Sequence, residues 1–435
     1  MKAPSALAAV LSVLVASGCG EAPSPKALAS GQSSTPNALF VAPADAAPAD
    51  APPADVPVGV VVDASAPAPV DASVDAAREA SVDVAPAVRA PAPVPLTWRD
   101  EYLPEFRFDV APADLGALLT AGHADRHPAT LRYMGQTYRG TIRQRLGNNS
   151  RCGDKRQFRF DFGETVTLPD GYRTDRFETD RGRCYVLHEW MAVRAMRQAA
   201  ERHPELRLLW KHTNVVAVYF NDGLYQVQTL TEDMNRAVPE RFLGTRNVTL
   251  YEHGCSGDGA DAWLNAFCVP TTAADLARTL DVPTFLYWSA VVKTLSPDDN
   301  FPDSPWNWYL VRDNASGAVY PVGDDWDSLP ATWDVATTDP FTPRTLEDEA
   351  QRHFVSLLAD GANRARYAED LREARALLDP STLLPAVEAK YAQVRALLAA
   401  TPDAPQRADW YDHVYTEEVP AWVRARYAFL AQPAP

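Results

Sequence analysis

The segment that decides the predicted fold covers residues 296–329 and reads SPDDNFPDSPWNWYLVRDNASGAVYPVGDDWDSL. Its acidic residues lie before an aromatic run and after a turn-bounded hairpin: Asp298, Asp299, Asp303, Asp324, Asp325 and Asp327. Asn307 stands between the two groups. Oxygen donors at both ends of a short β-unit suit a hard cation such as Mg²⁺, which usually keeps substrate phosphates among its ligands. Because Asp is also common in turns, a solvated acidic loop is the alternative.

A β-rich region precedes this segment. Residue alternation predicts half-buried strands over residues 138–144 and 158–162, and a strand–turn–strand unit over residues 215–232. The loop between the first two strands, residues 147–156, reads GNNSRCGDKR. Backbone N–H groups and basic side chains of such a loop can hold phosphate, although an ordinary hairpin loop is the alternative. No GxxxxGK[ST] pattern occurs, so the loop is not a P-loop.

Helical periodicity appears on both sides of the acidic segment. Residues 185–200 predict a helix with Glu189 near its start. This carboxylate either faces solvent and complements the helix dipole, or reaches a phosphate-binding lysine. A helix from Asp281 delivers the chain to the acidic segment, and further helices are expected near residues 354–358, 367–378, 384–398 and 423–430. These elements predict an α+β fold over residues 96–432.

The chain begins with the features of a bacterial lipoprotein signal. Lys2 precedes an apolar run over residues 6–16, which is too short to span a bilayer as a helix. Small residues then stand directly before Cys19, so we expect residues 1–19 to be a signal peptide and Cys19 to be lipidated. An ordinary secretory signal is the alternative. Gly20 follows in place of an Asp, which favours an anchor in the outer membrane or at the surface of a bacterial cell envelope.

Residues 20–95 are predicted to be a disordered linker. They consist mainly of Ala, Pro, Val, Ser and Asp, with Phe40 as the one aromatic residue. Such a composition cannot bury enough apolar surface to offset the entropy lost on ordering, and its prolines stiffen it into a spacer. The whole chain has a net charge of −16. Because it is acidic and has no basic patch, we do not expect it to bind nucleic acid.

Four cysteines follow Cys19, and they are Cys152, Cys184, Cys255 and Cys268. An even number of cysteines in an exported chain indicates disulfides, for which three pairings are possible. Their order along the chain favours 152–184 and 255–268.

The order of these parts resembles the CotH family, the spore-coat-protein-H-like atypical protein kinases. The Gly-Asn-Ser-Ser loop of that family, with its paired basic residues and following strand, is similar to residues 147–160. Its strand–turn–strand unit ending in Glu is similar to residues 221–232. Its three acidic and aromatic elements are similar to residues 299–301, 307–309 and 325–327, and its closing helix is similar to residues 422–426. The resemblance covers about residues 98–430.

The resemblance implies a kinase-like two-lobed α+β domain, with a β-rich first lobe and a mostly helical second lobe. Its activity would be phosphoryl transfer from ATP to a protein hydroxyl. Asp299, with Asp298 as the alternative, would be the catalytic carboxylate. Asp325, helped by Asn307 and Asp327, would hold Mg²⁺ or Mn²⁺. The nucleotide would contact Gly147, Asn148, Ser150, Lys155, Arg159 and Glu232.

The chain also departs from the family pattern. Asp222 and Gln226 stand where the family usually has Gly, Glu252 where Lys is common, and Asp324 where an apolar or aromatic residue precedes the Asp. Two functions are therefore open. The first is an exported, lipid-anchored protein kinase that acts on Ser or Thr of surface or secreted proteins. The second is a catalytically silent adhesin or envelope binding module of the same fold. A hydrolase with paired carboxylates is a weaker third, because no GxSxG or HExxH pattern occurs.

Overall fold

The structure is a computed structural model, and it describes eleven stretches of the chain. They are residues 93–120, 122, 124–145, 156–180, 185–256, 261–269, 272–296, 300–326, 335–346, 349–401 and 408–432. The chain divides into two units, residues 1–82 and 83–435, and all the described residues belong to the second. The predicted signal peptide, the lipidated Cys19 and almost the whole predicted linker lie outside the described residues. None of the described helices is both long enough and apolar enough to cross a membrane.

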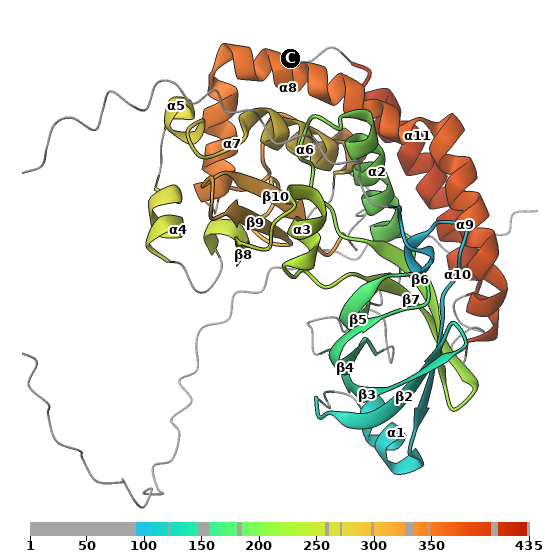
Figure 1. Cartoon of the computed structure of the whole chain (residues 1–435). Helices are drawn as coiled ribbons and strands as arrows, with labels where there is room; N and C mark the ends of the chain where they lie inside the picture. The colour runs from blue at the N-terminus through green and yellow to red at the C-terminus, as the bar shows by residue number, and fades with distance from the viewer. Residues whose placement is uncertain are drawn as a thin grey trace, which may run out of the picture. The chain divides into compact units, whose positions relative to one another are not determined.

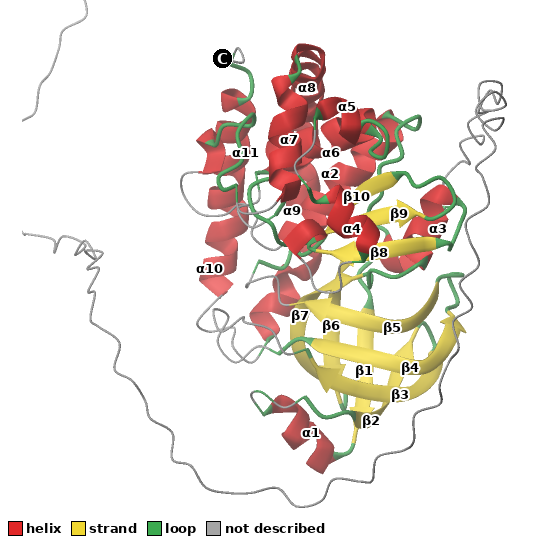
Figure 2. Ribbon diagram, turned by 90° about the vertical axis from the view of Figure 1, so that its left-hand side faces the viewer, coloured by secondary structure: helices red, strands yellow, loops and turns green. Residues whose placement is uncertain are grey.

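Seven strands close into a barrel (Figures 1 and 2). They are β1 (Glu105–Val110), β2 (His127–Tyr133), β3 (Gln136–Gln144), β4 (Phe158–Thr167), β5 (Arg173–Asp180), β6 (Thr213–Phe220) and β7 (Gly223–Thr231). Their order around the barrel is β1-β2-β3-β4-β5-β7-β6. The β1–β6 pair that closes the barrel is parallel, and the other neighbouring pairs are antiparallel.

Aromatic side chains fill the barrel. Phe106 and Phe108 on β1 meet Phe177 on β5 and Phe160 on β4, with ring centroids 4.5 Å and 5.5 Å apart respectively. All four are buried. Successive side chains of a strand point to opposite faces, so the alternating aromatics of the sequence all reach the interior. The strands predicted over residues 138–144 and 158–162 are confirmed, as β3 and β4.

The prediction of a kinase-like two-lobed fold is wrong. The β-rich part is a closed seven-stranded barrel of mixed strand direction, accompanied by a separate small sheet and several helices. Closure depends on β1, which lies parallel to β6 with Glu105 opposite Ala217. A period of two shows which face of a strand is buried but does not show which strands are neighbours. Since these two strands are far apart in the sequence, alternation alone could not reveal the barrel.

The second sheet and the helices form the rest of the described chain. The sheet has the order β10-β9-β8 and is antiparallel, with β8 (Val248–Glu252), β9 (Trp308–Asp313) and β10 (Val319–Gly323). The α-helices are α1 (Pro112–Leu119), α2 (His188–Arg202), α3 (Ala237–Leu243), α4 (Ala262–Phe267), α5 (Ala273–Leu276), α6 (Val282–Leu295), α7 (Glu349–Ala359), α8 (Gly361–Ala374), α9 (Pro380–Ala400), α10 (Ala408–His413) and α11 (Val419–Phe429). A π-helical turn, Val414–Glu418, connects the last two.

The central helix is α6, which begins where Asp281 caps it by accepting a hydrogen bond from the Thr284 backbone N–H. It is buried on nearly all sides, because it packs against α2, α8 and β10. Its Trp288 shares one apolar cluster with Trp190 of α2 and Trp308 of β9. The helix predicted from Asp281 is therefore an interior helix, and its C-terminal end leads to the acidic segment.

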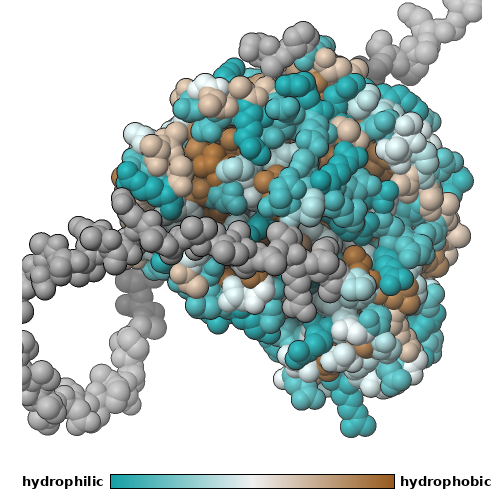
Figure 3. Space-filling model, turned by 45° about the horizontal axis from the view of Figure 1, so that its top comes forward, coloured by the Kyte–Doolittle hydropathy of each residue, from teal (hydrophilic) through white to brown (hydrophobic). Residues whose placement is uncertain are grey.

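The surface of the described part is mostly polar. On the face drawn in Figure 3, hydrophilic residues dominate and apolar ones form small separate areas. Among the described residues, the exposed large hydrophobic side chains are Val269, Trp306, Leu346 and Val355. Trp306 is the one of these that stands next to a predicted site residue, Asn307.

Candidate functional site

A polar pocket of about 380 Å³ lies between the barrel and the small sheet. Its barrel side is the outer face of β3, β4, β5 and β7 together with Lys211, and its sheet side is formed by the ends of β8, β9 and β10. The basic side chains that line it are Arg143, Arg145, Arg159 and Lys211. The acidic ones are Glu178, Asp180, Glu189, Glu232, Asp233, Glu252, Asp324 and Asp325. A site with this mixture can take an anion most readily when a cation accompanies it.

The barrel strands bring the arginines together in register. Arg143 on β3 lies directly opposite Arg159 on β4, and Arg159 lies opposite Glu178 on β5. Their neighbours Ile142, Phe158 and Phe160 point into the barrel core. The intervening residues therefore point outward, to the pocket.

Arg143 is the cation with the fewest partners. Within the described part of the chain it forms no ion pair, and its buried Nε has no hydrogen-bond partner. Burial lowers the pKa of Arg143, and the guanidinium groups of Arg159 and Arg126 lower it further. Like charges placed directly opposite each other in a sheet are destabilising. An anion in the pocket would relieve this repulsion and give Arg143 a partner.

Arg145 and Arg159 are partly neutralised by acids of β5. Nη1 of Arg145 lies 3.4 Å from Oδ2 of Asp180, and Nη1 of Arg159 lies 3.4 Å from Oε1 of Glu178. Burial acts to lower the pKa of Arg145, but Glu178, Asp180 and Asp325 outweigh it and raise this pKa. The charge of Asp325, on the sheet side, therefore acts on Arg145, on the barrel side.

Lys211 and Glu189 are two deeply buried ionisable residues of the pocket. The Lys211 side chain is 5% exposed and its ammonium donates a hydrogen bond to Asp324. Glu189, in the first turn of α2, is buried and accepts a hydrogen bond of 3.0 Å from Oγ1 of Thr231. Burial raises the pKa of Glu189, while the charge of Lys211 opposes this effect. Glu189 thus does not face solvent, and it lies within the electrostatic reach of a pocket lysine.

Asn307 and Asp325 stand at the end of the small sheet that lines the pocket. Asn307 directly precedes β9, Asp325 follows β10 by two residues, and the backbone N–H of Asp324 donates to the carbonyl oxygen of Asn307 at 2.8 Å. Both have left-handed backbones, with φ of +60° at Asn307 and +44° at Asp325. Residues other than glycine hold such conformations only where the surroundings enforce them, and they are frequent at functional sites.

Two glycines pack closely against tryptophan rings near the ends of β8 and β10. A Cβ on Gly323 would collide with the indole of Trp326, and a Cβ on Gly254 would collide with the indole of Trp308. Glycine is therefore required just before Asp324 and just after His253. The turn that presents Asp324 and Asp325 is consequently held by the Gly323–Trp326 contact.

His253 is a pocket residue that the sequence did not suggest. Its φ is +56°, and its Nδ1 accepts a hydrogen bond of 3.3 Å from the backbone N–H of Asn307. Because Nδ1 accepts, a neutral ring carries its proton on Nε2. The ring also makes an edge-to-face contact with Trp306, whose centroid is 5.1 Å away. His253 thereby links the end of β8 to the start of β9.

Glu232, predicted to lie beside the nucleotide base, lines the pocket but already has strong partners. Nη1 and Nη2 of Arg241 each donate to it at 2.9 Å, and the backbone N–H of His212 donates at 2.8 Å. Burial would raise its pKa, but Arg241 and the other donors lower it to about 2. Glu232 is therefore an ionised carboxylate that fixes the wall of the pocket, rather than one left open to a ligand.

The donor set on the sheet side suits a hard divalent cation. Asp325 supplies carboxylate oxygen, Asn307 supplies amide oxygen, and Asp324 supplies a further carboxylate one residue away. Among the described residues, no group of three or more His, Cys, Asp or Glu side chains is arranged to hold a metal by itself. Mg²⁺ is usually bound through one or two carboxylates, with substrate phosphates and water completing its octahedron. Asp325 and Asn307 fit that mode.

The structure brings together part of the predicted site. Arg159, Glu232, Asn307 and Asp325 line one pocket. The other predicted site residues lie outside the described residues: Gly147, Asn148, Ser150, Lys155, Asp298, Asp299, Asp327, Cys152 and Cys184. The pocket residues that sequence reasoning missed as ligands are Arg143, Lys211, Glu178, Asp180 and His253. The sequence did carry a signal for Arg143, Glu178 and Asp180, because each alternates along its strand with residues that point into the barrel.

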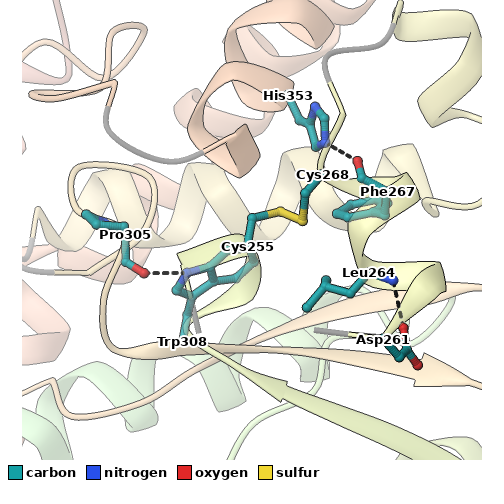
Figure 4. Close-up of a disulfide and its surroundings, with 8 residues drawn as sticks. All are labelled: Cys255, Asp261, Leu264, Phe267, Cys268, Pro305, Trp308 and His353. Atoms are coloured by element: carbon teal, nitrogen blue, oxygen red, sulfur yellow. Dashed lines mark hydrogen bonds between the residues drawn. A yellow bond between two sulfur atoms is a disulfide. The ribbon is translucent and has the colours of Figure 1, made fainter. Parts of the chain in front are cut away.

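Cys255 and Cys268 form a disulfide beside the sheet (Figure 4), with a sulfur–sulfur distance of 2.01 Å. This agrees with the pairing that chain order favours. The disulfide lies next to α4, whose first turn is capped by Asp261, and Nε2 of His353 donates to the carbonyl oxygen of Phe267 at 2.7 Å. Cys255 follows His253 by two residues, so the crosslink anchors one edge of the pocket.

Comparison of the chain with protein-family models and with curated proteins gives no match.

Proposed function

We propose that this chain is an ATP-dependent phosphotransferase that acts on hydroxyl groups of surface or secreted proteins. The observation that carries the proposal is the opposition of two donor sets across one pocket. Arg143, Arg145, Arg159 and Lys211 come from the barrel side, and Asn307 and Asp325 come from the sheet side. Cationic groups that hold phosphate and oxygen donors that hold a cation are the parts that phosphoryl transfer requires. The buried Nε of Arg143, which has no hydrogen-bond partner among the described residues, supports an anionic ligand over a purely structural pocket.

In the proposed reaction, the bond between the γ-phosphorus and its bridging oxygen breaks, and a phosphorus–oxygen bond forms to the acceptor hydroxyl. The nucleoside diphosphate leaves, and the hydroxyl proton goes to a carboxylate. We assign that carboxylate to Asp299, with Asp298 as the alternative, on the resemblance alone. Lys211, Arg143 and Arg159 hold the phosphates and offset their charge. A divalent cation held by Asp325 and Asn307 would neutralise the charge of the transferring group.

The remaining proposals follow from the sequence. Lipidation of Cys19 would place the enzyme at the bacterial cell envelope, and residues 20–95 would act as its spacer. The acceptor would then be a Ser or Thr hydroxyl of an envelope or secreted protein. No nucleic acid is proposed as a partner, because the chain carries a net charge of −16.

A binding module without catalysis is the second candidate. It is favoured by the contact between Lys211 and Asp324, because a lysine held by a carboxylate is not placed to stabilise a phosphoryl group during transfer. In that case, the pocket would bind a nucleotide or another phosphorylated ligand without transferring phosphate. An adhesin or envelope protein on a tether would have this property.

Incubation with labelled ATP separates the two candidates. The purified protein is incubated with Mg²⁺ or Mn²⁺ and peptides that contain Ser or Thr, beside Asp325→Ala and the surface control Asp109→Ala. We expect transfer or autophosphorylation by the unmodified protein and by Asp109→Ala, and its loss in Asp325→Ala. Nucleotide-induced stabilisation without transfer supports the binding module. Absence of both overturns the proposal for the pocket. Loss of transfer in Asp299→Ala but not in Asp298→Ala would identify the proton acceptor.

A further inference from the structure

One ion pair connects the two sides of the pocket. Lys211 lies two residues before the threonine that begins β6, and Asp324 directly follows β10. Their side chains are 5% and 24% exposed, and the ammonium donates directly to the carboxylate. An ammonium group this deeply buried requires a counter-ion, because an unpaired buried charge is strongly destabilising. In the structure, Asp324 is the counter-ion in direct contact with Lys211, and the buried Glu189 lies within its electrostatic reach.

Asp324 is held in this position by its own backbone. Its N–H donates to the carbonyl oxygen of Asn307 at 2.8 Å, and its carbonyl oxygen accepts from Nδ2 of Asn300 at 2.6 Å. Asn300 is itself buried. The carboxylate is therefore presented to Lys211 by a fixed turn and is not a mobile surface group.

A second electrostatic interaction crosses the pocket in the same direction. Asp325, the next residue, acts on Arg145 and contributes to raising the pKa of that guanidinium. Adjacent acids of the small sheet thus act on two cations of the barrel side, Asp324 through a direct hydrogen bond and Asp325 through its charge. A phosphate that binds Lys211 must displace Asp324, and this carboxylate then needs a cation of its own.

We propose that Asp324 occupies Lys211 in place of a ligand phosphate, so that a divalent cation and a phosphorylated ligand bind cooperatively. The inference rests on the proposed function, since it concerns the same pocket. A phosphate alone would leave Asp324 and Asp325 facing it without a counter-charge. A cation alone would be repelled by Lys211 and Arg145. When both bind, Lys211 exchanges one anion for another, and the released carboxylate faces the cation. Asp324 is then the residue that makes anion binding depend on the metal.

Binding measurements on the full chain test this coupling. Inorganic tripolyphosphate is titrated by calorimetry with and without Mg²⁺, and thermal denaturation is followed under the same conditions. We expect the affinity for tripolyphosphate to be at least about tenfold higher when Mg²⁺ is present, and Mg²⁺ to bind more tightly with tripolyphosphate by the same factor. Affinities that do not depend on the other component overturn the inference and leave the proposed function intact. Failure of tripolyphosphate and of nucleotide to bind at all overturns the proposed function.

Asp324→Asn separates the effect of the protein from complex formation between Mg²⁺ and tripolyphosphate in solution, which is the same for every variant. It removes the charge and keeps the shape, so we expect metal-free tripolyphosphate to bind about tenfold more tightly and the effect of Mg²⁺ to shrink. Asp109→Asn is the matched control. It removes the same charge from a surface ion pair with Arg132 and should behave like the unmodified protein.

Asp324→Ser provides a second neutral variant if Asp324→Asn does not fold. Lys211→Met should lose metal-free binding of tripolyphosphate whether or not Asp324 is present. The variant lacks the ammonium group for which Asp324 and phosphate compete. The inference is overturned if the neutral variant binds metal-free tripolyphosphate no more tightly than Asp109→Asn does. It is equally overturned if the neutral variant retains the full effect of Mg²⁺.

Discussion

The side-chain nitrogen of Asn300 lies 2.9 Å from the carbonyl oxygen of Asn307. The same nitrogen lies 2.6 Å from the carbonyl oxygen of Asp324. One buried amide therefore holds together the chain at the start of β9 and the chain at the end of β10, where the two proposed cation ligands stand. Asn307 is itself one of the two residues that Asn300 binds, and Asp325 directly follows the other, Asp324. Asn300 therefore sets the spacing between Asn307 and Asp325.

Asn300→Asp should damage both stability and the pocket. The replacement keeps the shape but removes both donated hydrogen bonds and places a carboxylate against two carbonyl oxygens. We expect the free energy of unfolding to fall by about 2 kcal/mol or more, measured by urea denaturation. Binding of Mg²⁺ with tripolyphosphate should weaken as well. Asn314→Asp is the control, since Asn314 is exposed in the β9–β10 hairpin and should tolerate the change. Equal effects of the two substitutions would contradict a positioning role for Asn300.

The sequence predicted the strands better than their arrangement. The alternating aromatics of β3 and β4 were recognised, because each strand carries its own pattern of buried and exposed residues. Barrel closure was missed, because it depends on β1 pairing with a strand that lies far along the chain, with Glu105 opposite Ala217. The helix from Asp281 was placed correctly, but its burial on all sides depends on helices that come later, such as α8. The local residue pattern therefore identified individual strands and helices. Their arrangement depends on contacts between segments that are far apart in the sequence.

The buried pair of Lys293 and Asp303 supplies a second prediction. Nζ of Lys293 donates to Oδ1 of Asp303 at 2.6 Å, and both side chains are 1% exposed. Asp303→Asn should destabilise the protein by about 3–5 kcal/mol, because it leaves a buried ammonium without its counter-ion. The double replacement Lys293→Met with Asp303→Leu should recover much of this loss. Urea denaturation of the single and double variants measures the effect, and a double variant no better than the single one would refute the charge argument.

A third prediction concerns acid stability and His212. This ring is buried and stacks on Trp98, with centroids 5.5 Å apart. Burial, assisted by the charge of Arg241, lowers its pKa from 6.5 to about 3. The unfolded chain therefore binds a proton between pH 6.5 and pH 3 while the folded chain does not, so stability is present above this window and falls as the pH decreases through it. Between pH 7 and pH 5 the expected loss is roughly 2 kcal/mol.

His212→Phe keeps a flat ring in the same cavity and removes the titrating group. Its free energy of unfolding should depend less on pH than that of the unmodified protein, by the same roughly 2 kcal/mol between pH 7 and pH 5. Urea denaturation at a series of pH values gives the comparison. His413→Phe, at an exposed position, serves as the control. An unchanged pH dependence in His212→Phe would show that this histidine is not a source of acid sensitivity.

The pocket shows which site residues a sequence can reveal. Asn307 and Asp325 were predicted from acidic and amide residues at both ends of a β-unit, and both line the pocket. Arg143 could have been found, since it alternates with Ile142 and must face away from the core. Lys211 could not, because it is a single lysine between Trp210 and His212 and its partner Asp324 comes from another sheet. Glu232, predicted to lie beside a nucleotide base, lines the pocket, but its bond to Arg241 was not foreseeable from spacing.

A fourth prediction concerns the disulfide. It joins residues separated by 13 positions, a short loop for which crosslinking stabilises by about 3 kcal/mol in the chain-entropy account. The double variant Cys255→Ser, Cys268→Ser should lose about this amount, measured by urea denaturation without reductant. Because Cys255 follows His253 by two residues, binding of Mg²⁺ with tripolyphosphate should also weaken. Reductant should bring the unmodified protein to the stability of the double variant, and a remaining difference would contradict this account.

The last prediction tests the unpartnered cation. Arg143 lies directly opposite Arg159, and its buried Nε has no hydrogen-bond partner within the described part of the chain. Arg143→Gln removes a like-charge repulsion, so stability should stay the same or rise. The same change removes a phosphate contact, so tripolyphosphate affinity with Mg²⁺ should fall about tenfold. A substitution that preserves or raises stability while it lowers affinity indicates that the residue serves ligand binding rather than folding.

Arg139→Gln is the matched control, because Arg139 is exposed on the same strand and lies opposite Thr130. It should leave both stability and tripolyphosphate affinity unchanged. Calorimetric titration and urea denaturation of the two variants give the four values needed. If Arg143→Gln loses stability and keeps its affinity, the arginine supports the barrel rather than a ligand, and the anion must bind through Lys211, Arg145 and Arg159 alone.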